Sequence, residues 1–410
     1  MLGEKQELLA IVLSAILFLC AIWASSLVAI AQEENRILTI ALNEDIDSPN
    51  PYVGVNDASY VFFGMIYDYL IAPNEDLING PNLARSWWLL DGNLSASMGS
   101  DFSLIRSSYK DPGDWPLGSI WQYNLTENVS WSDGVPFSAD DVVWTINIQL
   151  GANFNIFWAY QPYTRWIDHA EKIDDLKVRI FFVDFDTKKP VTISFGNNLF
   201  IPIMPKHCFE GKESTYLAQS WNGVPAIGTG PFKGTPSLAT DIIAKETITV
   251  TRNKFYDFID EDGVRKGLGA AYNRTIEIDT ILLTCFSEDS TLSMAIKTGE
   301  CDVGKLAAAT FLVWQTDESL PESISTVAIL SCTGFSKQVV INAYEKASGD
   351  INFLRLDPAV QRAAAISVNK TYIKNVIYKG LAEIGYSLLP PVWPKWYWEP
   401  GNEPSTFNVT

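Results

Sequence analysis

The segment from Trp131 to Ile146, WSDGVPFSADDVVWTI, constrains the fold more than any other stretch of this chain. Asp133 and Gly134 form a turn dipeptide, and Pro136 fixes the direction in which the chain leaves the turn. Ser138 is predicted to cap a helix, because its hydroxyl can accept a hydrogen bond from the backbone N–H of either aspartate that follows. Those aspartates place negative charge in the first helical turn, where the helix dipole favours it.

A strand is predicted immediately before this segment, over residues 119–125. Its alternation places Trp121, Tyr123 and Leu125 on one face. Strand, turn and capped helix therefore form one rigid module, and none of its residues needs a catalytic role.

Strands and helices alternate irregularly along the rest of the chain. Further strands are expected over 36–42, 177–184, 247–251, 276–285 and 339–343, and further helices over 58–70, 287–298, 358–368 and 371–378. A chain of 410 residues with 47% hydrophobic residues is long enough for two or three structural units with their own cores. The pattern predicts an α/β architecture with more than one lobe.

The charge of the chain limits its partners. The formal net charge is −18. Nucleic acids and anionic membrane surfaces require a cationic footprint, which such a balance does not provide. We therefore expect no nucleic-acid partner.

Residues 8–31 contain no charged side chain and are long enough to cross a bilayer. Ala29-Ile30-Ala31 before Gln32 fits the small-residue pattern of a signal-peptide cleavage site. Residues 1–31 are thus predicted to be either a cleaved signal peptide or a retained membrane anchor. Either alternative places the protein outside the cytoplasm, in the periplasm or at the cell surface.

Few residues suggest metal or redox chemistry. Beyond residue 31 only Cys208, Cys285, Cys301 and Cys332 remain, which allows at most two disulfide bridges and no disulfide framework. His207 and Cys208 are adjacent, but neighbouring side chains of a strand point apart, so structural roles are expected for both. The acidic segment 257–263 lacks the spacing of a calcium loop. We expect no metal and no cofactor.

Catalytic motifs are equally sparse. Gly228-Thr229-Gly230 lacks the Gly-Lys-Ser/Thr of a phosphate loop, and the chain contains neither a Gly-x-Ser-x-Gly elbow nor a His-Glu-x-x-His helix. A pair of carboxylates of the glycosidase type stays open, because sequence does not show such a pair. The 14 tryptophans also suit a groove that stacks on sugars, peptides or other flat ligands.

Several motifs occur in an order that carries a family resemblance. They are ILTIAL, PNLARSWW, WQYNLTENVSWSDGVPFSADDVVWTI, IGTGPF followed by VTRNKFY, EDSTLSMAIKTGECDVG, VVINAY, RLDPAVQRAAAISVNKTYIKNVIYKGLA and LLPP. In this order, over residues 37–391, the chain resembles the extracellular solute-binding proteins of family 5, the peptide, nickel and oligosaccharide class that serves ABC importers. Two departures are Thr126-Glu127, where the family usually has a basic residue, and Asn369-Lys370 in place of Asp-Arg.

The resemblance implies a two-lobed periplasmic-binding-protein-like α/β fold of type II, with an extra subdomain inserted in the first lobe. The first lobe would span residues 32–303 with the insertion at about 82–185, and the second lobe would span 304–410. Family members usually continue well past the LLPP motif. We therefore expect a C-terminally truncated chain whose second lobe is incomplete.

The implied function is solute capture for an ABC importer rather than catalysis. The protein would close on a solute by a hinge motion and deliver it to the permease subunits. Oligopeptide or dipeptide is the expected solute. An oligosaccharide-binding member of the same class, an exported glycosidase and a receptor without a permease stay open as alternatives.

By the same resemblance, ligand contacts are expected from two sides of the groove. Asn56 and Tyr60 follow the first strand, and Asn342 and Tyr344 follow a strand of the second lobe. Trp158 is the expected stacking residue from the inserted subdomain.

Overall fold

The computed structural model describes residues 35–73, 79–90, 117–150, 154–157, 159–191, 196, 199–244, 247–326, 358–382 and 384. The apolar segment 8–31, the expected strand 339–343 and the LLPP motif lie outside these residues. Within them, no helix has the length and apolar character that a bilayer crossing requires.

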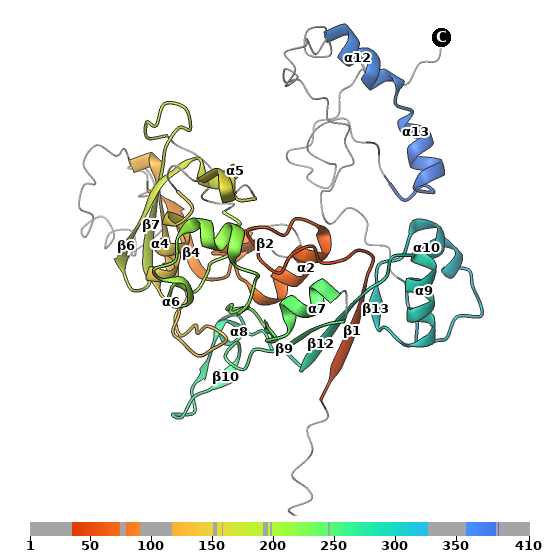
Figure 1. The fold of residues 1–410 in the computed structure, drawn as a ribbon, viewed down its shortest axis with the longest axis horizontal. Coiled ribbons are helices and arrows are strands. Elements are labelled where there is room, and N and C mark those ends of the chain that lie inside the picture. Colours follow the sequence, from red (N-terminus) through yellow and green to blue (C-terminus); the bar gives the residue numbers. More distant parts are fainter. Residues whose placement is uncertain are drawn as a thin grey trace, which may run out of the picture.

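A five-stranded mixed sheet forms one part of the molecule (Figure 1). Its strands, in spatial order, are β13 (Val303–Gly304), β1 (Ile37–Leu42), β12 (Thr280–Cys285), β9 (Ile248–Arg252) and β8 (Phe232–Gly234). β1 is parallel to both β12 and β13, whereas β9 is antiparallel to its two neighbours. The first strand of the chain thus pairs with strands that lie more than 240 residues later.

A four-stranded antiparallel sheet forms a second part, on the left in Figure 1. Its strands, in spatial order, are β4 (Ala84–Leu89), β5 (Ile120–Leu125), β7 (Lys177–Phe182) and β6 (Ile167–Asp174). Two short hairpins accompany the sheets, β2 (Ile71–Pro73) with β3 (Asn79–Pro81) and β10 (Phe258–Ile259) with β11 (Arg265–Lys266).

Helices and helical turns connect the strands. The α-helices are α2 (Asp57–Ile66), α4 (Ala139–Asn147), α5 (Gln161–Thr164), α6 (Lys206–Phe209), α7 (Leu238–Ala244), α8 (Leu268–Ala271), α9 (Asp289–Thr298), α10 (Ala308–Trp314), α12 (Pro358–Ser367) and α13 (Lys370–Tyr372). Short 3-10 turns are η2 (Leu117–Ser119) and η3 (Phe154–Phe157), and π-helical turns are η5 (Tyr216–Ser220) and η6 (Ile373–Ile377).

The module predicted around Ser138 is present. Gly134 has a φ of +96°, which the Asp-Gly turn requires, and its N–H donates to the carbonyl of Trp131 at 2.8 Å. The Ser138 hydroxyl accepts from the N–H of Asp140 at 3.3 Å, and α4 begins at the next residue. In addition, Asp141 accepts from the N–H of Ser138 at 2.9 Å, which completes a capping box that the sequence reading did not include.

The Gly-rich segment 227–232 passes against the end of α2. The N–H of Gly230 donates to the carbonyl of Ile66 at 2.9 Å, and Thr229 donates to Asp68 at 2.9 Å. A Cβ on Gly228 would lie 1.8 Å from the Ile66 carbonyl oxygen. Glycine is therefore required here because two backbones meet at close range.

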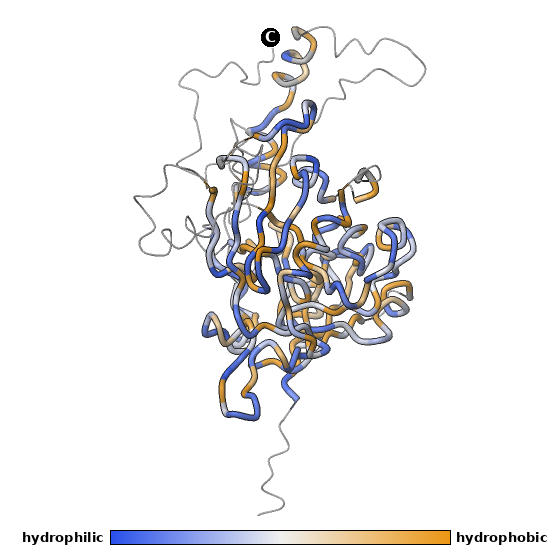
Figure 2. The backbone as a smooth tube through the Cα atoms, turned by 90° about the vertical axis from the view of Figure 1, so that its left-hand side faces the viewer, coloured by the Kyte–Doolittle hydropathy of each residue, from blue (hydrophilic) through white to orange (hydrophobic). Residues whose placement is uncertain are grey.

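One large hydrophobic cluster joins both sheets and the helices between them. Its fully buried members include Phe62, Leu83, Tyr123, Trp131 and Phe182. In Figure 2 hydrophobic stretches run along strands in the middle of the molecule, while several loops at its edge are hydrophilic. A smaller cluster packs α9 on β1 through Leu292, Ala295 and Ala41.

The other expected elements in the described residues form at the expected places, with shifted ends. α2 ends at Ile66, four residues before the expected end. α9 ends at Thr298, and its C-cap Gly299 is left-handed with a φ of +77°. β4 and β6 were not expected from the sequence. β6 reads IDHAEKID and lies at a sheet edge, where charged side chains are tolerated and hide the strand pattern.

Candidate functional site

The strands β1, β12 and β13 end at one edge of the five-stranded sheet. The register pairs Leu42 with Cys285 and Ala41 with Gly304, so the carboxyl ends of the three parallel strands lie in line. Ligands of α/β sheets bind outside such carboxyl ends. The chain leaves β1 at this edge, runs through residues 43–56 and enters α2.

The loop 43–56 is held by its own acidic side chains. The Asp47 carboxylate accepts from the backbone N–H of Val55 at 3.1 Å and from the hydroxyl of Ser59. Glu44 accepts from the N–H of Ala58 at 3.0 Å. Both carboxylates order the loop. Glu44 also satisfies the N–H of Ala58 in the first turn of α2, where a backbone N–H has no acceptor within the helix.

Asn56 is the N-cap of α2. Its side-chain oxygen accepts from the N–H of Ser59 at 2.9 Å, and its side-chain nitrogen donates to the carbonyl of Asp45. Both ends of the amide are therefore engaged within the loop and the helix start.

Tyr60 projects from the same helix and is 44% exposed. Its ring meets that of Phe63 edge-on, with 6.0 Å between centroids. Partial burial and the nearby Asp47 carboxylate raise the pKa of the Tyr60 hydroxyl above its ordinary value. The phenol stays neutral at physiological pH and offers an apolar face with one hydroxyl.

Four exposed apolar side chains lie close together in the sequence around the start of α2. Val53, Val55, Tyr60 and Val61 are each 40–44% exposed, and they lie within nine residues of the chain. We call these four residues the α2 face.

Buried aromatic rings support the loop from the side of the inserted segment. Tyr52 contacts Phe157 and Tyr160 edge-on, at centroid distances of 4.8 and 6.0 Å. The Tyr160 hydroxyl donates to the carbonyl of Pro51 at 2.8 Å. Trp158, the expected stacking residue, lies outside the described residues, but the neighbours named here join its segment to the loop that precedes α2.

Tyr163 adds a second hydroxyl close to Tyr60. Burial raises the pKa of Tyr163, and the charge of an ionised Tyr60 would raise it further. Asn342 and Tyr344, expected on the opposite side of the groove, lie outside the residues that the structure describes. The described half of the candidate site therefore consists of the α2 face and its aromatic support.

The sequence reading missed three members of this face. Val53, Val55 and Val61 carry no motif, and only their exposure separates them from core valines. Their position in the sequence could have identified them. The segment that follows the first parallel strand lies at the carboxyl edge of the sheet, where ligands of such folds bind.

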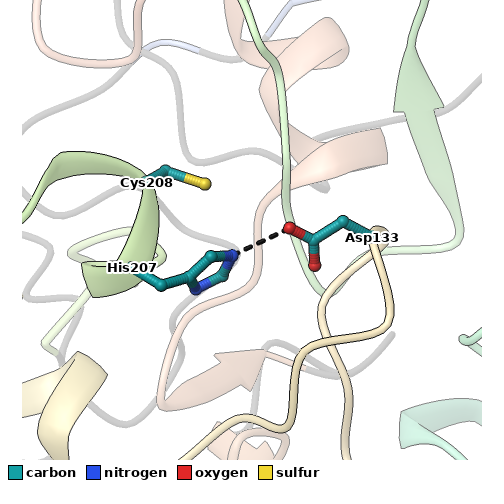
Figure 3. A group of neighbouring side chains, drawn as sticks. All are labelled: Asp133, His207 and Cys208. Atoms are coloured by element: carbon teal, nitrogen blue, oxygen red, sulfur yellow. Dashed lines mark hydrogen bonds and ion pairs between the residues drawn. The ribbon is translucent and has the colours of Figure 1, made fainter.

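A second group of side chains brings the Asp133-Gly134 turn together with helix α6 (Figure 3). Asp133, His207 and Cys208 each offer one ligand atom, and these atoms all lie within 4.8 Å of one another. The Nε2 atom of His207 is 2.8 Å from Oδ2 of Asp133. The expectation that His207 and Cys208 point apart as in a strand is wrong, because they lie on the short helix α6.

The thiol of Cys208 is protonated at neutral pH in this metal-free geometry. Burial and the carboxylates of Asp133 and Asp141 raise its pKa to about 11. Cys208 and Cys301 are free cysteines. Cys332 lies outside the described part of the chain.

Two carboxylates of the acidic hairpin around β10 and β11 are paired with cations of the same hairpin. Arg265 binds both carboxylate oxygens of Asp257, at 2.6 and 2.7 Å, and Lys266 pairs with Asp260 at 2.5 Å. The hydrogen bond from Arg265 lowers the pKa of Asp257. These carboxylates therefore stabilise the hairpin.

Comparison with known proteins decides the family. The profile of the bacterial extracellular solute-binding proteins, family 5 Middle, matches residues 80–410. The chain belongs to this family. The resemblance inferred from the ordered motifs is thereby confirmed.

Solved structures share the fold of this family 5 protein. The oligopeptide-binding protein AppA from Bacillus subtilis, in complex with a nonapeptide, is 17% identical with a TM-score of 0.60, over 91% of this chain and 61% of that chain. NikZ from Campylobacter jejuni, in complex with Ni(L-His), is 20% identical with a TM-score of 0.57, over 88% of this chain and 58% of that chain. The expected α/β fold of the two-lobed periplasmic binding proteins is confirmed.

A curated relative extends the range of ligands found among similar proteins. The peptidoglycan-binding protein YepA from Agrobacterium fabrum is 27% identical over 188 residues, which are 45% of this chain and 26% of that protein. The match thus spans about a quarter of that relative's length. The ligands named for these three proteins are a peptide, a nickel complex and peptidoglycan.

Proposed function

We propose that this family 5 protein is the solute-capturing component of an ABC importer and that its solute is an oligopeptide. The observation that carries the proposal is the α2 face at the carboxyl edge of the parallel strands, in a chain that matches the family over 331 residues (80 to 410). The protein acts by binding and hinge closure, and no bond of the solute is broken. It acts outside the cytoplasm, with residues 1–31 directing its export or anchoring it.

The chemistry of the α2 face favours peptide over sugar. The eight tryptophans of the described residues (87, 88, 121, 131, 144, 166, 221 and 314) are all buried or half-buried. An oligosaccharide groove uses exposed indoles for stacking. The exposed residues of the α2 face are instead three valines and one tyrosine, which suit the apolar side chains of a peptide.

The site residues divide into two roles in this proposal. Tyr60 contacts the solute from the first lobe, together with Trp158 from the inserted subdomain. Asn342 and Tyr344 contact it from the second lobe. Asn56 positions α2 and the loop before it, because both ends of its amide are already engaged.

The proposed domains follow the same division. The first lobe spans residues 32–303 and holds the five-stranded sheet, and the inserted subdomain at about 82–185 holds the four-stranded sheet. The second lobe spans residues 304–410. Closure of the lobes on the solute requires contacts that the solute makes better in the closed state.

The test is calorimetric titration of the full chain, kept in mild detergent. Di- to octapeptides, cello- and xylo-oligosaccharides and nickel with small chelators are titrated in turn. The proposal expects saturable binding of a peptide and a thermal midpoint that rises with peptide concentration as mass action requires. Binding of only sugars or only nickel chelates by the folded chain contradicts the oligopeptide assignment.

A matched pair of variants tests the α2 face itself. Tyr60→Ala is expected to raise the peptide Kd by at least about tenfold, because aromatic anchors carry a large share of binding energy. Ile259→Ala removes a side chain that is 72% exposed in the β10 hairpin and is expected to leave the Kd unchanged. Equal effects of both variants would show that the α2 face has no special part in binding.

A further inference from the structure

We propose that Asp133, His207 and Cys208 form a binding site for a single Zn²⁺ ion. The ion would join the turn at Asp133-Gly134 to helix α6. Figure 3 shows the three side chains converging on one point from two separate segments, residues 131–136 and helix α6. The site is independent of the proposed solute groove and of the function proposed for it.

The separations are close to those of a zinc site. Zn–N and Zn–O distances of about 2.0–2.2 Å and a Zn–S distance of about 2.3 Å place tetrahedral ligand atoms about 3.3–3.7 Å apart. Here the ligand atoms lie within 4.8 Å of one another, and His207 Nε2 and Asp133 Oδ2 are 2.8 Å apart. Binding of the ion therefore requires side-chain rotations that change these separations by up to about 1 Å.

The donor set selects the class of ion. Ca²⁺ and Mg²⁺ prefer oxygen ligands throughout, whereas imidazole and thiolate together suit Zn²⁺. Three protein ligands leave a fourth tetrahedral position for water. No reaction is proposed for that water.

The turn presents Asp133 in a fixed orientation. Oδ1 of its carboxylate accepts from the N–H of Val135 at 3.2 Å, which leaves Oδ2 directed at His207. Gly134 fixes the turn with its positive φ, and a Cβ there would lie 2.8 Å from Phe255. Hydrogen bonds that orient a ligand carboxylate in this way are typical of metal sites.

Helix α6 is fixed to the same module. The N–H of Lys206 donates to Asp141 of α4 at 2.9 Å, and the N–H of Cys208 donates to the carbonyl of Pro205 at 3.1 Å. The ring of His207 also packs edge-on against Trp131, with 6.3 Å between centroids. The two ligand-bearing segments are therefore held in place before an ion arrives, so binding needs little reorganisation.

The test uses Zn²⁺ and Co²⁺ on the full chain, stripped of metal with a chelator and kept reduced. Zn²⁺ is spectroscopically silent, so Co²⁺ serves as the visible probe. The proposal expects one Co²⁺ per chain with a thiolate-to-metal charge-transfer band, and displacement of that Co²⁺ by Zn²⁺.

Variants assign the ligands. Cys208→Ser is expected to abolish the charge-transfer band, and Asp133→Asn and His207→Gln are each expected to raise the metal Kd by at least about tenfold. Cys285→Ser, at another half-buried cysteine, is the matched control and keeps the band. Circular dichroism checks that each variant folds, and His207→Gln decides the question if Cys208→Ser does not fold.

Two results would overturn the proposal. One is a folded wild-type chain that gives no charge-transfer band with excess Co²⁺. The other is a band that survives in Cys208→Ser, which would place the metal on a different cysteine.

Discussion

The carboxylate of Asp141 accepts a 2.9 Å hydrogen bond from the backbone N–H of Lys206, which lies 65 residues further along the chain. Its other oxygen accepts from the N–H of Ser138 at 2.9 Å. One side chain thus completes the cap of α4 and fixes the start of α6. The segment 131–146 is therefore joined to a part of the chain that lies far from it in the sequence.

Substitutions of Asp141 and Ser138 are expected to lower the free energy of unfolding, and the substitution that removes more hydrogen bonds should lower it more. Asp141→Ala leaves two N–H groups without their charged acceptor and should lower the free energy of unfolding by about 3 kcal/mol. Ser138→Ala removes only the hydroxyl cap and should cost about 1 kcal/mol. Urea denaturation followed by circular dichroism measures both.

Asp140→Ala is the control for these two variants. Asp140 lies in the same helical turn, but its partner is Lys172 at the surface, at 2.5 Å. Surface ion pairs contribute about 0–1 kcal/mol, so this variant should stay close to wild type. A loss at Asp140 as large as that at Asp141 would argue against this role of Asp141.

The ionisation of Asp141 predicts a pH dependence of stability. Burial raises its pKa above the ordinary 3.8, against the lowering effect of the hydrogen bonds from Ser138 and Lys206. In the pH window between the ordinary and the raised value the folded state binds more protons than the unfolded state. The contribution of this group to the free energy of unfolding therefore falls as the pH rises through that window.

The difference in unfolding free energy between wild type and Asp141→Asn isolates this contribution. It is expected to decrease from pH 3.8 upward and to become constant above the raised pKa. Urea titrations at several pH values supply the difference. A difference that grows with pH would mean that the carboxylate form is the one stabilised by folding.

Local patterns let the sequence predict the cap of α4 and five of the thirteen strands in the described residues, β1, β5, β7, β9 and β12. The Asp-Gly turn and the Ser138 cap depend on residues within a few positions of one another, so their chemistry is visible in the chain. The bond from Lys206 to Asp141 is invisible there, because only the folded backbone brings the two residues together. β4 and β6 were missed because neither shows a clear alternation of apolar and polar residues.

In the candidate sites, too, the sequence predicted single residues but not the tertiary contacts between them. Tyr60 was identified from a family resemblance, and the structure adds its exposure and the valines around it. His207 and Cys208 were considered as metal ligands but treated as a strand, so their side chains were expected to diverge. The helical conformation of α6 and the approach of Asp133, 74 residues away, are tertiary features.

Two glycines near α2 are expected to respond in opposite ways to alanine. Gly64 lies in the exposed part of the helix with nothing within 4 Å of an added Cβ, so Gly64→Ala should stabilise by about 0.5–1 kcal/mol. Gly228→Ala places a Cβ 1.8 Å from the Ile66 carbonyl oxygen and should destabilise by at least about 2 kcal/mol. Thermal unfolding of the two variants against wild type checks the contrast, and a neutral Gly228→Ala would disprove the close approach.

Variants of Asn56 distinguish a helix-capping role of this residue from a direct contact with the ligand. Asn56→Ala removes the acceptor for the Ser59 N–H and should cost about 1 kcal/mol of stability. Asn56→Ser restores a capping oxygen but loses the bond from the amide to Asp45, so it should destabilise the protein less than Asn56→Ala does. Because the amide is already used within the loop, the peptide Kd of Asn56→Ser should also match that of wild type in calorimetric titration. A stable Asn56→Ser variant that binds peptide at least about tenfold more weakly would instead make Asn56 a direct ligand contact.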